Sequence, residues 1–326
     1  MTPSFDIVTV GEALIDFVSR REPGADKLNL EGNPGGAPAN VLSCAARLGK
    51  RTAIVTKVGS DGFGSFLQEQ ISRAGVCTDY MISDPLHPTT LAMVTLDATG
   101  NRSFGFYRTQ TADVMLSPED LPYDVIAGAR IFHFGSVTMT AEPARSATFA
   151  AARYAKEHGV FVSYDPNLRK PLWSSLSEAK EAIEEGLRLA DAVKLSDDEM
   201  EFLMEGESLE QRAVALVQKF GIRFLIVTMG PKGCFCVCGG QVIHAKTYAN
   251  ACVDTTGAGD AFWGATLTQF LETEKAPWDL SREEITSLLQ FSNAAGSLAT
   301  TKYGAIPAMP TREQIHTCIE TASYLE

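Results

Sequence analysis

The chain has 326 residues, of which 45% are hydrophobic and 21% charged, an ordinary composition for a globular protein. Its formal net charge is −12, from 28 Lys and Arg against 40 Asp and Glu. A nucleic-acid partner is not expected, because binding it requires clustered positive charge. Residues 1–6 have neither the basic nor the apolar part of a secretory signal, and no apolar run is long enough to span a bilayer. We therefore expect no membrane association.

The seven cysteines are an odd number spread through a long chain, which predicts a reduced, cytoplasmic setting. Cys234, Cys236 and Cys238 alternate just before two glycines, so their thiols would share one face of a strand. A zinc site would need C-x-x-C pairs or a fourth ligand close by, and we interpret the run as part of a hairpin instead. No chemical role is assigned to the isolated histidines, which are His87, His133, His158 and His316.

Six short apolar runs, each followed by glycine or polar residues, are predicted to form strands. They cover residues 5–10, 52–58, 130–134, 160–164, 192–195 and 224–227. Between them, amphipathic periods predict helices at 37–48 and 61–74, and residues 261–271 are also helix-like. Ser281 and Glu284 form a capping box at the start of a further helix.

This alternation predicts an α/β fold with a mostly parallel sheet covered by helices on both faces, a three-layer α/β/α arrangement. A single domain over residues 1–326 is expected, since one α/β domain of this size is common. Residues 13–34 and 88–110 interrupt the alternation with short strands and polar turns such as 97–100. We interpret them as a small β-lid at the ligand edge of the sheet, the alternative being a surface hairpin without a gating role. Its exposed strand edges favour a homodimer.

The stretch from Val253 to Phe262 holds the strongest chemical signal. Gly257, Ala258 and Gly259 lie where a helix begins, so their backbone N–H groups and the helix dipole would form an anion site. Asp260 follows at once, and a carboxylate beside an anion site suits a base that deprotonates a nucleophile attacking phosphorus. An isolated G-x-G before a helix would more simply be an ordinary turn.

A second glycine-rich segment, residues 32–40, opens the helix predicted at 37–48. Gly35 and Gly36 permit close approach of the backbone to a ligand, and Asn40 lies one turn inside the helix, facing the same cavity. The segment is preceded by the pattern Gly11-Glu12-x-x-x-Asp16 at the end of the first predicted strand. Both lie at the carboxyl edge of the sheet, where open α/β sheets bind ligands.

These motifs together resemble those of the PfkB (ribokinase-like) carbohydrate kinases, and the resemblance covers nearly the whole chain. Residues 254–260, D-T-T-G-A-G-D, are similar to the C-terminal signature of that family, and residues 11–16 and 32–40 to its N-terminal one. The D-P-N-L-R run at 165–169 and the segments GEALIDF (11–17) and GGAPAN (35–40) are similar to those of fructokinase-type members. The resemblance implies an ATP-dependent kinase that converts fructose to fructose 6-phosphate, with sugar and ATP as small-molecule partners.

Several other functions remain open at this stage. Within the same family the acceptor could be ribose, a nucleoside such as aminoimidazole riboside, or 2-keto-3-deoxygluconate. A non-catalytic sugar-binding protein on the same fold is disfavoured by the intact Asp260 and its glycine loop. A dinucleotide-dependent enzyme is disfavoured because Gly11-Glu12-Ala13, not G-x-G-x-x-G, follows the first strand, and a Walker P-loop is also absent.

The resemblance also implies roles for individual residues in substrate binding and catalysis. Asp260 would be the general base, with the amides of Gly257, Ala258 and Gly259 as the anion hole. Arg169 would neutralise charge on the transferring phosphate, with a surface salt bridge as the alternative. The residues implied in sugar binding are Asp16, Gly35, Gly36, Asn40, Asn167, Asp260 and, from the lid, Arg108.

On the nucleotide side, the resemblance implies that ATP is bound by Lys194, Thr228, Gly230, Gly233, Gly257, Gly259 and Asn293. Glu199 would orient Mg²⁺ through water, although Ser196 stands where the family has asparagine. A monovalent cation, K⁺, would be held by the loops that contain Asp254, Thr256, Ala299 and Gly304. Ala308 replaces a serine that often contributes to this site in the family.

Overall fold

The structure is a computed structural model that describes residues 4–20, 26, 29–96 and 102–325. A ten-stranded sheet runs through its centre in the order β14-β13-β12-β11-β10-β9-β1-β4-β5, with β6 also paired to β4. The pairings from β12 to β5 are parallel, whereas β13 and β14 are antiparallel. The predicted fold class, a mostly parallel sheet within an α/β/α arrangement, is confirmed.

All six predicted strands are present, within one or two residues of the expected ends. They are β1 (Phe5–Val10), β4 (Thr52–Gly59), β9 (Ala129–Phe134), β10 (Phe161–Tyr164), β11 (Ala192–Ser196) and β12 (Phe224–Thr228). The short strands β5 (Val76–Cys77) and β6 (Met81–Asp84) extend one edge. The other edge is the antiparallel hairpin of β13 (Cys234–Cys238) and β14 (Gln241–Ala245), as predicted for the cysteine run. Over the described residues, no group of three or more His, Cys, Asp or Glu side chains is arranged to hold a metal ion.

Alternate side chains of each strand serve the two faces of the sheet, as the period of two requires. In β1, Val8 and Val10 pack on one side and Ile7 on the other. The first side is covered by α4 (Ala144–Glu157), α5 (Leu176–Leu189), α6 (Asp197–Leu203) and α7 (Leu209–Phe220), with α3 (Tyr123–Ala127) beside α4. The second side carries α1 (Ala37–Arg47), α2 (Gly62–Arg73), α8 (Ala258–Glu272) and α9 (Arg282–Ala299), and α10 (Arg312–Thr321) packs on α9.

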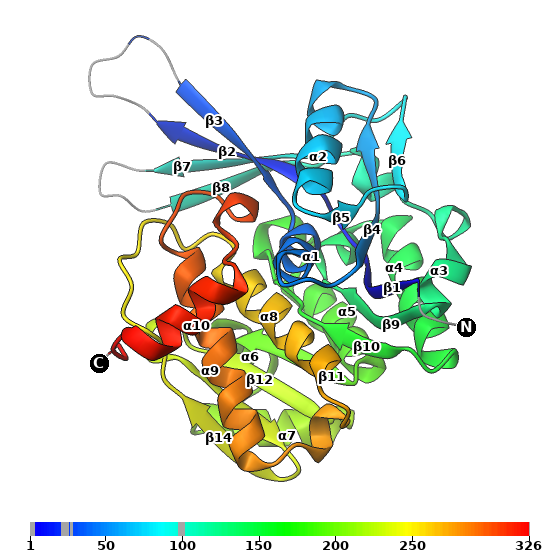
Figure 1. Cartoon of the computed structure of the whole chain (residues 1–326). Helices are drawn as coiled ribbons and strands as arrows, with labels where there is room; N and C mark the ends of the chain where they lie inside the picture. The colour runs from blue at the N-terminus through cyan, green and yellow to red at the C-terminus, as the bar shows by residue number, and fades with distance from the viewer. Residues whose placement is uncertain (1–3, 21–25, 27–28, 97–101, 326) are drawn as a thin grey trace.

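Helix α8 is the most buried of these helices and determines where the site lies. It begins at Ala258, three residues before the predicted start, and nearly every residue from Asp260 to Leu271 is buried. It packs against both α1 and α9 in the middle of its layer (Figure 1). Trp263 anchors it to the sheet, because its indole Nε1 donates to Ser163 Oγ at 2.9 Å on β10. The start of α8 is therefore held rigidly at the carboxyl edge of the sheet.

A second, four-stranded sheet stands apart from the main one (Figure 1). Its order is β3-β2-β7-β8, from β2 (Leu14–Arg20), β3 (Asn29–Gly35), β7 (Leu91–Leu96) and β8 (Arg102–Tyr107). These strands come from the two stretches predicted to form the lid, and the predicted turn at 97–100 lies outside the described residues. Among the described helices, none is both long and apolar enough to cross a membrane.

Candidate active site

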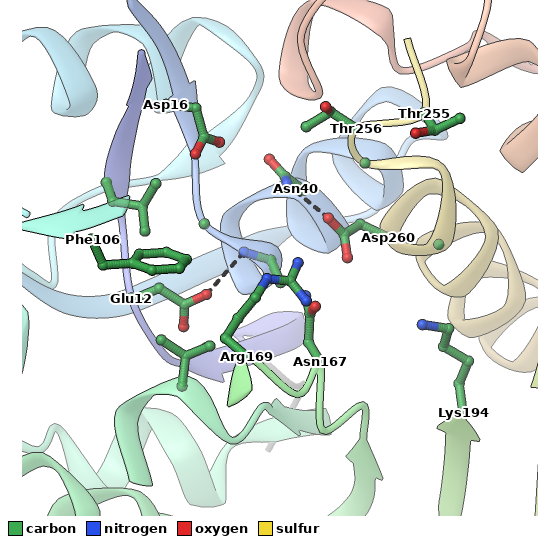
Figure 2. A pocket seen from close by; sticks show the side chains of 16 residues that line it. Glu12, Asp16, Asn40, Phe106, Asn167, Arg169, Lys194, Thr255, Thr256 and Asp260 are labelled. Carbon is green, nitrogen blue, oxygen red and sulfur yellow. Dashed lines mark hydrogen bonds between the residues drawn. The ribbon is translucent and has the colours of Figure 1, made fainter. Parts of the chain in front are cut away.

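Two cavities meet at the start of α8. The first, of about 400 Å³, is lined by residues from the lid, α1, the loop after β10 and the start of α8 (Figure 2). The second, of about 260 Å³, lies between the loop after β12, the segment before α8, and α9. Thr255 and Gly259 line both cavities, so the beginning of α8 forms the boundary between them. A molecule in one cavity would therefore meet a molecule in the other at these backbone amides.

Asp260 lies in the first turn of α8 and faces the first cavity. Asn40 on α1 donates a hydrogen bond from Nδ2 to Asp260 Oδ2 at 2.8 Å, and both side chains are buried (Figure 2). Burial raises the pKa of Asp260 above its ordinary value, against the opposing effects of Asn40, Lys194 and Arg169. A carboxylate with a raised pKa, fixed by one hydrogen bond, is well suited to accept a proton.

The glycine loop before Asp260 has the backbone that the sequence predicted. Gly257 has φ of 78°, and a Cβ there would lie only 2.6 Å from the Cβ of Ala305, so no other residue fits without displacement. The N–H groups at the start of a helix have no acceptor within the helix. These groups, with the positive end of the helix dipole, provide donors for an anion at the boundary of the two cavities.

The Gly35-Gly36 turn brings the chain close to two carboxyl-bearing residues. A Cβ at Gly35 would lie 2.2 Å from Asp16 Oδ2, and Gly36 has φ of 107° with its Cβ position 2.4 Å from the carbonyl oxygen of Glu12. Asp16 on β2 lines the first cavity. Burial raises its pKa to about 7, and Arg169 opposes this shift. Asp16, Gly36 and Asn40 are thus brought together as predicted, whereas Gly35 serves to make room for Asp16.

The loop after β10 contributes Asn167 and Arg169 to the first cavity. Asn167 has φ of 50°, an unusual conformation for a residue other than glycine, and its N–H donates to Asp165 Oδ1 at 3.2 Å. Arg169 is exposed, and it makes no salt bridge within the described part of the chain, so the surface salt bridge considered from the sequence is not formed there. Its guanidinium instead acts electrostatically on Asp16 and Asp260.

Lys194, in the middle of β11, lies beneath the start of α8 (Figure 2). Its Nζ donates to Asp165 Oδ2 at 2.9 Å, and both side chains are buried. Burial lowers the pKa of Lys194, but the neighbouring carboxylates, Asp165 foremost, outweigh it, so the pKa lies above its ordinary value. A Cβ at Gly259 would come 3.1 Å from Nζ. The charged ammonium group therefore lies directly against the predicted anion loop, on the side of the first cavity.

Arg108, expected to reach the substrate from the lid, is placed differently. It follows β8 immediately, and its Nε donates to Asp113 Oδ2 at 2.7 Å while Nη1 donates to Thr140 Oγ1 at 2.6 Å. Asp113 is buried, and a buried carboxylate requires a partner, which explains why the guanidinium turns towards it. From β8, it is Phe106, two positions earlier, that lines the first cavity.

Sequence reasoning missed Glu12 as a site residue. It lines the first cavity, its side chain is buried, and Oε1 accepts a hydrogen bond of 3.0 Å from the backbone N of Ala37 (Figure 2). Burial raises its pKa to about 7. The pattern Gly11-Glu12 at the end of the first strand was a signal for it, but nothing in the sequence distinguishes a cavity carboxyl from a capping one. Asp165 was likewise recognised only as part of the D-P-N-L-R run.

The second cavity collects most residues predicted to bind ATP. Thr228, Gly230, Gly233, Gly259 and Asn293 line it, whereas Gly257 and Lys194 line only the first cavity. The chain approaches closely here as well, since a Cβ at Gly233 would lie 2.2 Å from the carbonyl oxygen of Ala245. The amide of Asn293 donates to Cys234 Sγ at 3.2 Å. This contact fixes the side chain but leaves its oxygen for another partner.

Glu199, predicted to orient Mg²⁺, is held by the backbone. Its two oxygens accept hydrogen bonds from Leu168 N at 2.7 Å and from Ser196 N at 2.8 Å, and Ser196 is the N-cap of α6. The residue that replaces the family asparagine therefore caps a helix. Each carboxylate oxygen can accept more than one hydrogen bond, so Glu199 still fits contact through water. Mg²⁺ itself prefers one or two carboxylates together with substrate phosphates, and Glu199, which lines neither cavity, is the carboxylate predicted to serve it.

The loops predicted to hold a monovalent cation lie side by side. Asp254 Oδ1 accepts hydrogen bonds from Thr256 N and Oγ1, and Oδ2 accepts one from Gly304 N at 3.1 Å. The backbone N–H groups of Val253 and Asp254 donate to Thr300 O, one residue after Ala299. The structure thus brings Asp254, Thr256 and Gly304 together through hydrogen bonds that they share.

Known proteins are similar over the whole chain. It is 41% identical over 326 residues to probable fructokinase-3 of Arabidopsis thaliana, covering 98% of this chain and 91% of that protein. A fructokinase from Xylella fastidiosa, solved with bound ATP, has a TM-score of 0.89 at 33% identity and covers 97% of this chain and 98% of its own. A double mutant of a fructokinase from Vibrio cholerae O395, solved with fructose, ADP and potassium, has a TM-score of 0.86 at 33% identity, covering 98% and 100%.

The family predicted from the motifs is confirmed by a match that spans most of the chain. Residues 4–312 match the pfkB family carbohydrate kinases. Members of this family transfer a phosphoryl group, so the prediction of a phosphotransferase is confirmed as well. The chain belongs to the pfkB family of carbohydrate kinases.

Proposed function

We propose that this kinase transfers the γ-phosphoryl group of ATP to fructose and releases fructose 6-phosphate and ADP. The observation that carries the proposal is the start of α8, where Asp260 and the backbone amides of the glycine loop lie between two cavities. Full-length relatives named fructokinase and solved fructokinases of the same fold support it. The first cavity would hold the sugar, and the second the nucleotide.

Asn40 and Asp16 would bind sugar hydroxyl groups. Asn40 Oδ1 is buried and has no hydrogen-bond partner among the residues that the structure describes, although Nδ2 of the same amide is bonded to Asp260. An unpaired buried acceptor that lines a cavity is costly unless a ligand donor reaches it, and a sugar hydroxyl is such a donor. Asp16 adds a carboxylate acceptor on the lid side, close to the turn at Gly36.

In the chemical step, Asp260 would take the proton of the C6 hydroxyl of fructose. The hydroxyl oxygen would attack the γ-phosphorus, and ADP would leave with the bridging oxygen. The amides of Gly257, Ala258, Gly259 and Asp260 would stabilise negative charge on the phosphoryl oxygens as it develops. Lys194 lies against Gly259 and would supply a fixed positive charge there.

Arg169 would add a second, mobile positive charge from the exposed side of the cavity, where it already acts on Asp260. Bound Mg²⁺ would neutralise phosphate charge, with Glu199 contacting it through water. The lid strands, through Phe106, would exclude water that otherwise competes as acceptor.

A panel of acceptors tests the substrate. ADP release would be measured with ATP and Mg²⁺ and with fructose, ribose, nucleosides or 2-keto-3-deoxygluconate. We expect fructose to give the highest kcat/KM, and Asp260→Asn to release ADP at least about 100-fold more slowly than the wild type. A higher kcat/KM for another acceptor would reassign the substrate within the family. No turnover with any acceptor would overturn the proposal of catalysis.

Other features stay predictions. They are the cytoplasmic location, the single domain over residues 1–326, and a homodimer formed through the lid strands. One relative, 42% identical over 316 residues, is named probable fructokinase-6, chloroplastic. Size-exclusion chromatography with light scattering would test the dimer directly.

A further inference from the structure

Glu12 is a buried carboxyl group whose side chain the chemistry proposed above does not use. It follows β1, only 3% of its surface is exposed, and it lines the first cavity. Among the described residues it receives a single hydrogen bond from another residue, from Ala37 N to Oε1. Among the described residues, no other residue donates a hydrogen bond to its second oxygen. A buried carboxyl group that lines a cavity and receives so few hydrogen bonds from its neighbours is a candidate for contact with a ligand.

No cation of the described chain pairs directly with Glu12. Arg108 is the cation whose charge affects it, but that guanidinium forms its ion pair with Asp113 and a hydrogen bond with Thr140. Burial accordingly raises the pKa of Glu12 to about 7. A ligand hydroxyl that donates to Glu12 would compensate for part of this unfavourable burial, since a hydrogen bond to a charged acceptor is stronger than one between neutral groups.

The position of Glu12 decides which hydroxyls it could meet. Figure 2 shows Glu12 beside Phe106, across the first cavity from Asp260 and Lys194. If the 6-hydroxyl of fructose lies at Asp260, the far side of the sugar carries the hydroxyls of C1, C2 and C3. We propose that Glu12 is a specificity-determining residue whose carboxyl group accepts a hydrogen bond from one of these three hydroxyls. This inference rests on the proposed function.

The alternative is a purely structural role, in which Glu12 only fixes the start of α1 through Ala37. Substrate analogues separate the two roles. A structural change would lower kcat/KM for all sugars alike, whereas loss of a direct contact removes the preference for fructose over the one analogue that lacks the contacted hydroxyl. The analogues are 1-deoxyfructose, 2,5-anhydromannitol, which lacks the anomeric hydroxyl, and 3-deoxyfructose.

The experiment compares kcat/KM for fructose and each analogue in the wild type, Glu12→Gln and Glu12→Ala. We expect the wild type to prefer fructose over at least one analogue by roughly 10-fold or more. In Glu12→Ala this ratio should fall to within about threefold of unity, mainly through KM. Glu12→Gln keeps an acceptor for Ala37 N but replaces the second oxygen with an amide donor, so it should lose most of the ratio even if Glu12→Ala does not fold.

Asp61→Asn is the matched control. Asp61 is also a carboxylate bonded to an amide at a helix start, Gly64 N on α2, but it does not line the first cavity. Its analogue ratios should equal those of the wild type. Unchanged ratios in both Glu12 variants, or a wild type that distinguishes none of the three analogues, would overturn the inference. Either outcome leaves the proposed function intact provided that the wild type phosphorylates fructose, and absence of that activity would refute the proposed function instead.

Discussion

Asn40 Nδ2 donates a hydrogen bond to Asp260 Oδ2 at 2.8 Å, although the two residues are 220 positions apart in the chain. The bond joins α1 to α8, the helix that carries the proposed base. It stabilises the ionised form of Asp260, because an amide donor favours the charged acceptor. Within the described part of the chain, Oδ1 of the same amide has no hydrogen-bond partner. One side chain thus connects the proposed substrate contact to the proposed base.

This link predicts a shift in pH dependence for Asn40→Ala. Loss of the donor removes an interaction that lowers the pKa of Asp260, so that pKa should rise further. Because the base must be ionised, the fall of kcat towards low pH should occur at a higher pH than in the wild type. Ser43→Ala changes a buried residue of the same helix that lines neither cavity, and it should keep the wild-type profile. An identical acid limb in Asn40→Ala would contradict the link.

Asp260→Asn should lower kcat by roughly 10²–10⁴-fold through loss of the general base. The amide can still pair with Asn40, so the thermal midpoint should not decrease. Steady-state ADP release together with circular dichroism would check both statements. Turnover near that of the wild type would remove Asp260 from the mechanism.

Asp16 should make substrate binding and stability depend on pH around neutrality. Burial raises the pKa of Asp16 to about 7, so most molecules carry the ionised carboxylate, the better acceptor of hydrogen bonds from sugar hydroxyls, only above that pH. KM for the sugar should therefore rise as the pH falls below about 7. The folded state binds the proton of the Asp16 carboxyl group more tightly than the unfolded state does. The stability that this protonated carboxyl contributes is therefore lost as the pH rises from about 4 to about 7.

Asp16→Asn provides the corresponding stability test. The variant should be more stable than the wild type at pH 8, by roughly 1–3 kcal/mol, and should lose this advantage at pH 4, where the wild-type carboxyl is protonated in both states. Urea unfolding without ligand at the two pH values measures the difference. An advantage that is independent of pH would show that Asp16 is not the titrating group.

The two glycines of the anion loop should tolerate alanine differently. Gly257→Ala places a Cβ 2.6 Å from Ala305 Cβ at φ of 78°, so both strain and a clash are expected, with a lower thermal midpoint and little activity. Gly259→Ala meets only the end of the Lys194 side chain, with Nζ at 3.1 Å. It should fold normally and reduce kcat by displacing that ammonium group. Equal thermal midpoints for both variants would contradict this reasoning.

K⁺ should activate the enzyme if the loops around Asp254 and Gly304 hold a monovalent cation next to the glycine loop. Turnover would be compared in K⁺ and in choline buffers of equal ionic strength. We expect a higher kcat in K⁺ than in choline for the wild type. The ratio of the two kcat values should be smaller for Asp254→Asn, which replaces the carboxylate that joins the two loops with a neutral amide. Equal rates in both buffers for the wild type would reject the site.

The structure explains why some residues could be placed at the two cavities from the sequence and others could not. Gly257 and Gly36 could be identified because each conformation and close approach requires glycine, which the sequence records as a local pattern. Arg108 was placed in the substrate site on its motif, but the buried Asp113, only five positions later, takes its guanidinium. Glu12 was overlooked because its environment depends on the position of α1 and the lid.

The amino-acid sequence by itself determined the strand and helix alternation, the glycine loop before Asp260 and the family, because these depend on periodicity and on backbone conformations that few residues adopt. Only the tertiary structure decided that Asn40 holds Asp260, that Lys194 lies against Gly259, and that Glu12 faces the cavity. These relationships join residues far apart in the chain, and the orientation and pKa of a buried side chain depend on every neighbour that packing brings to it.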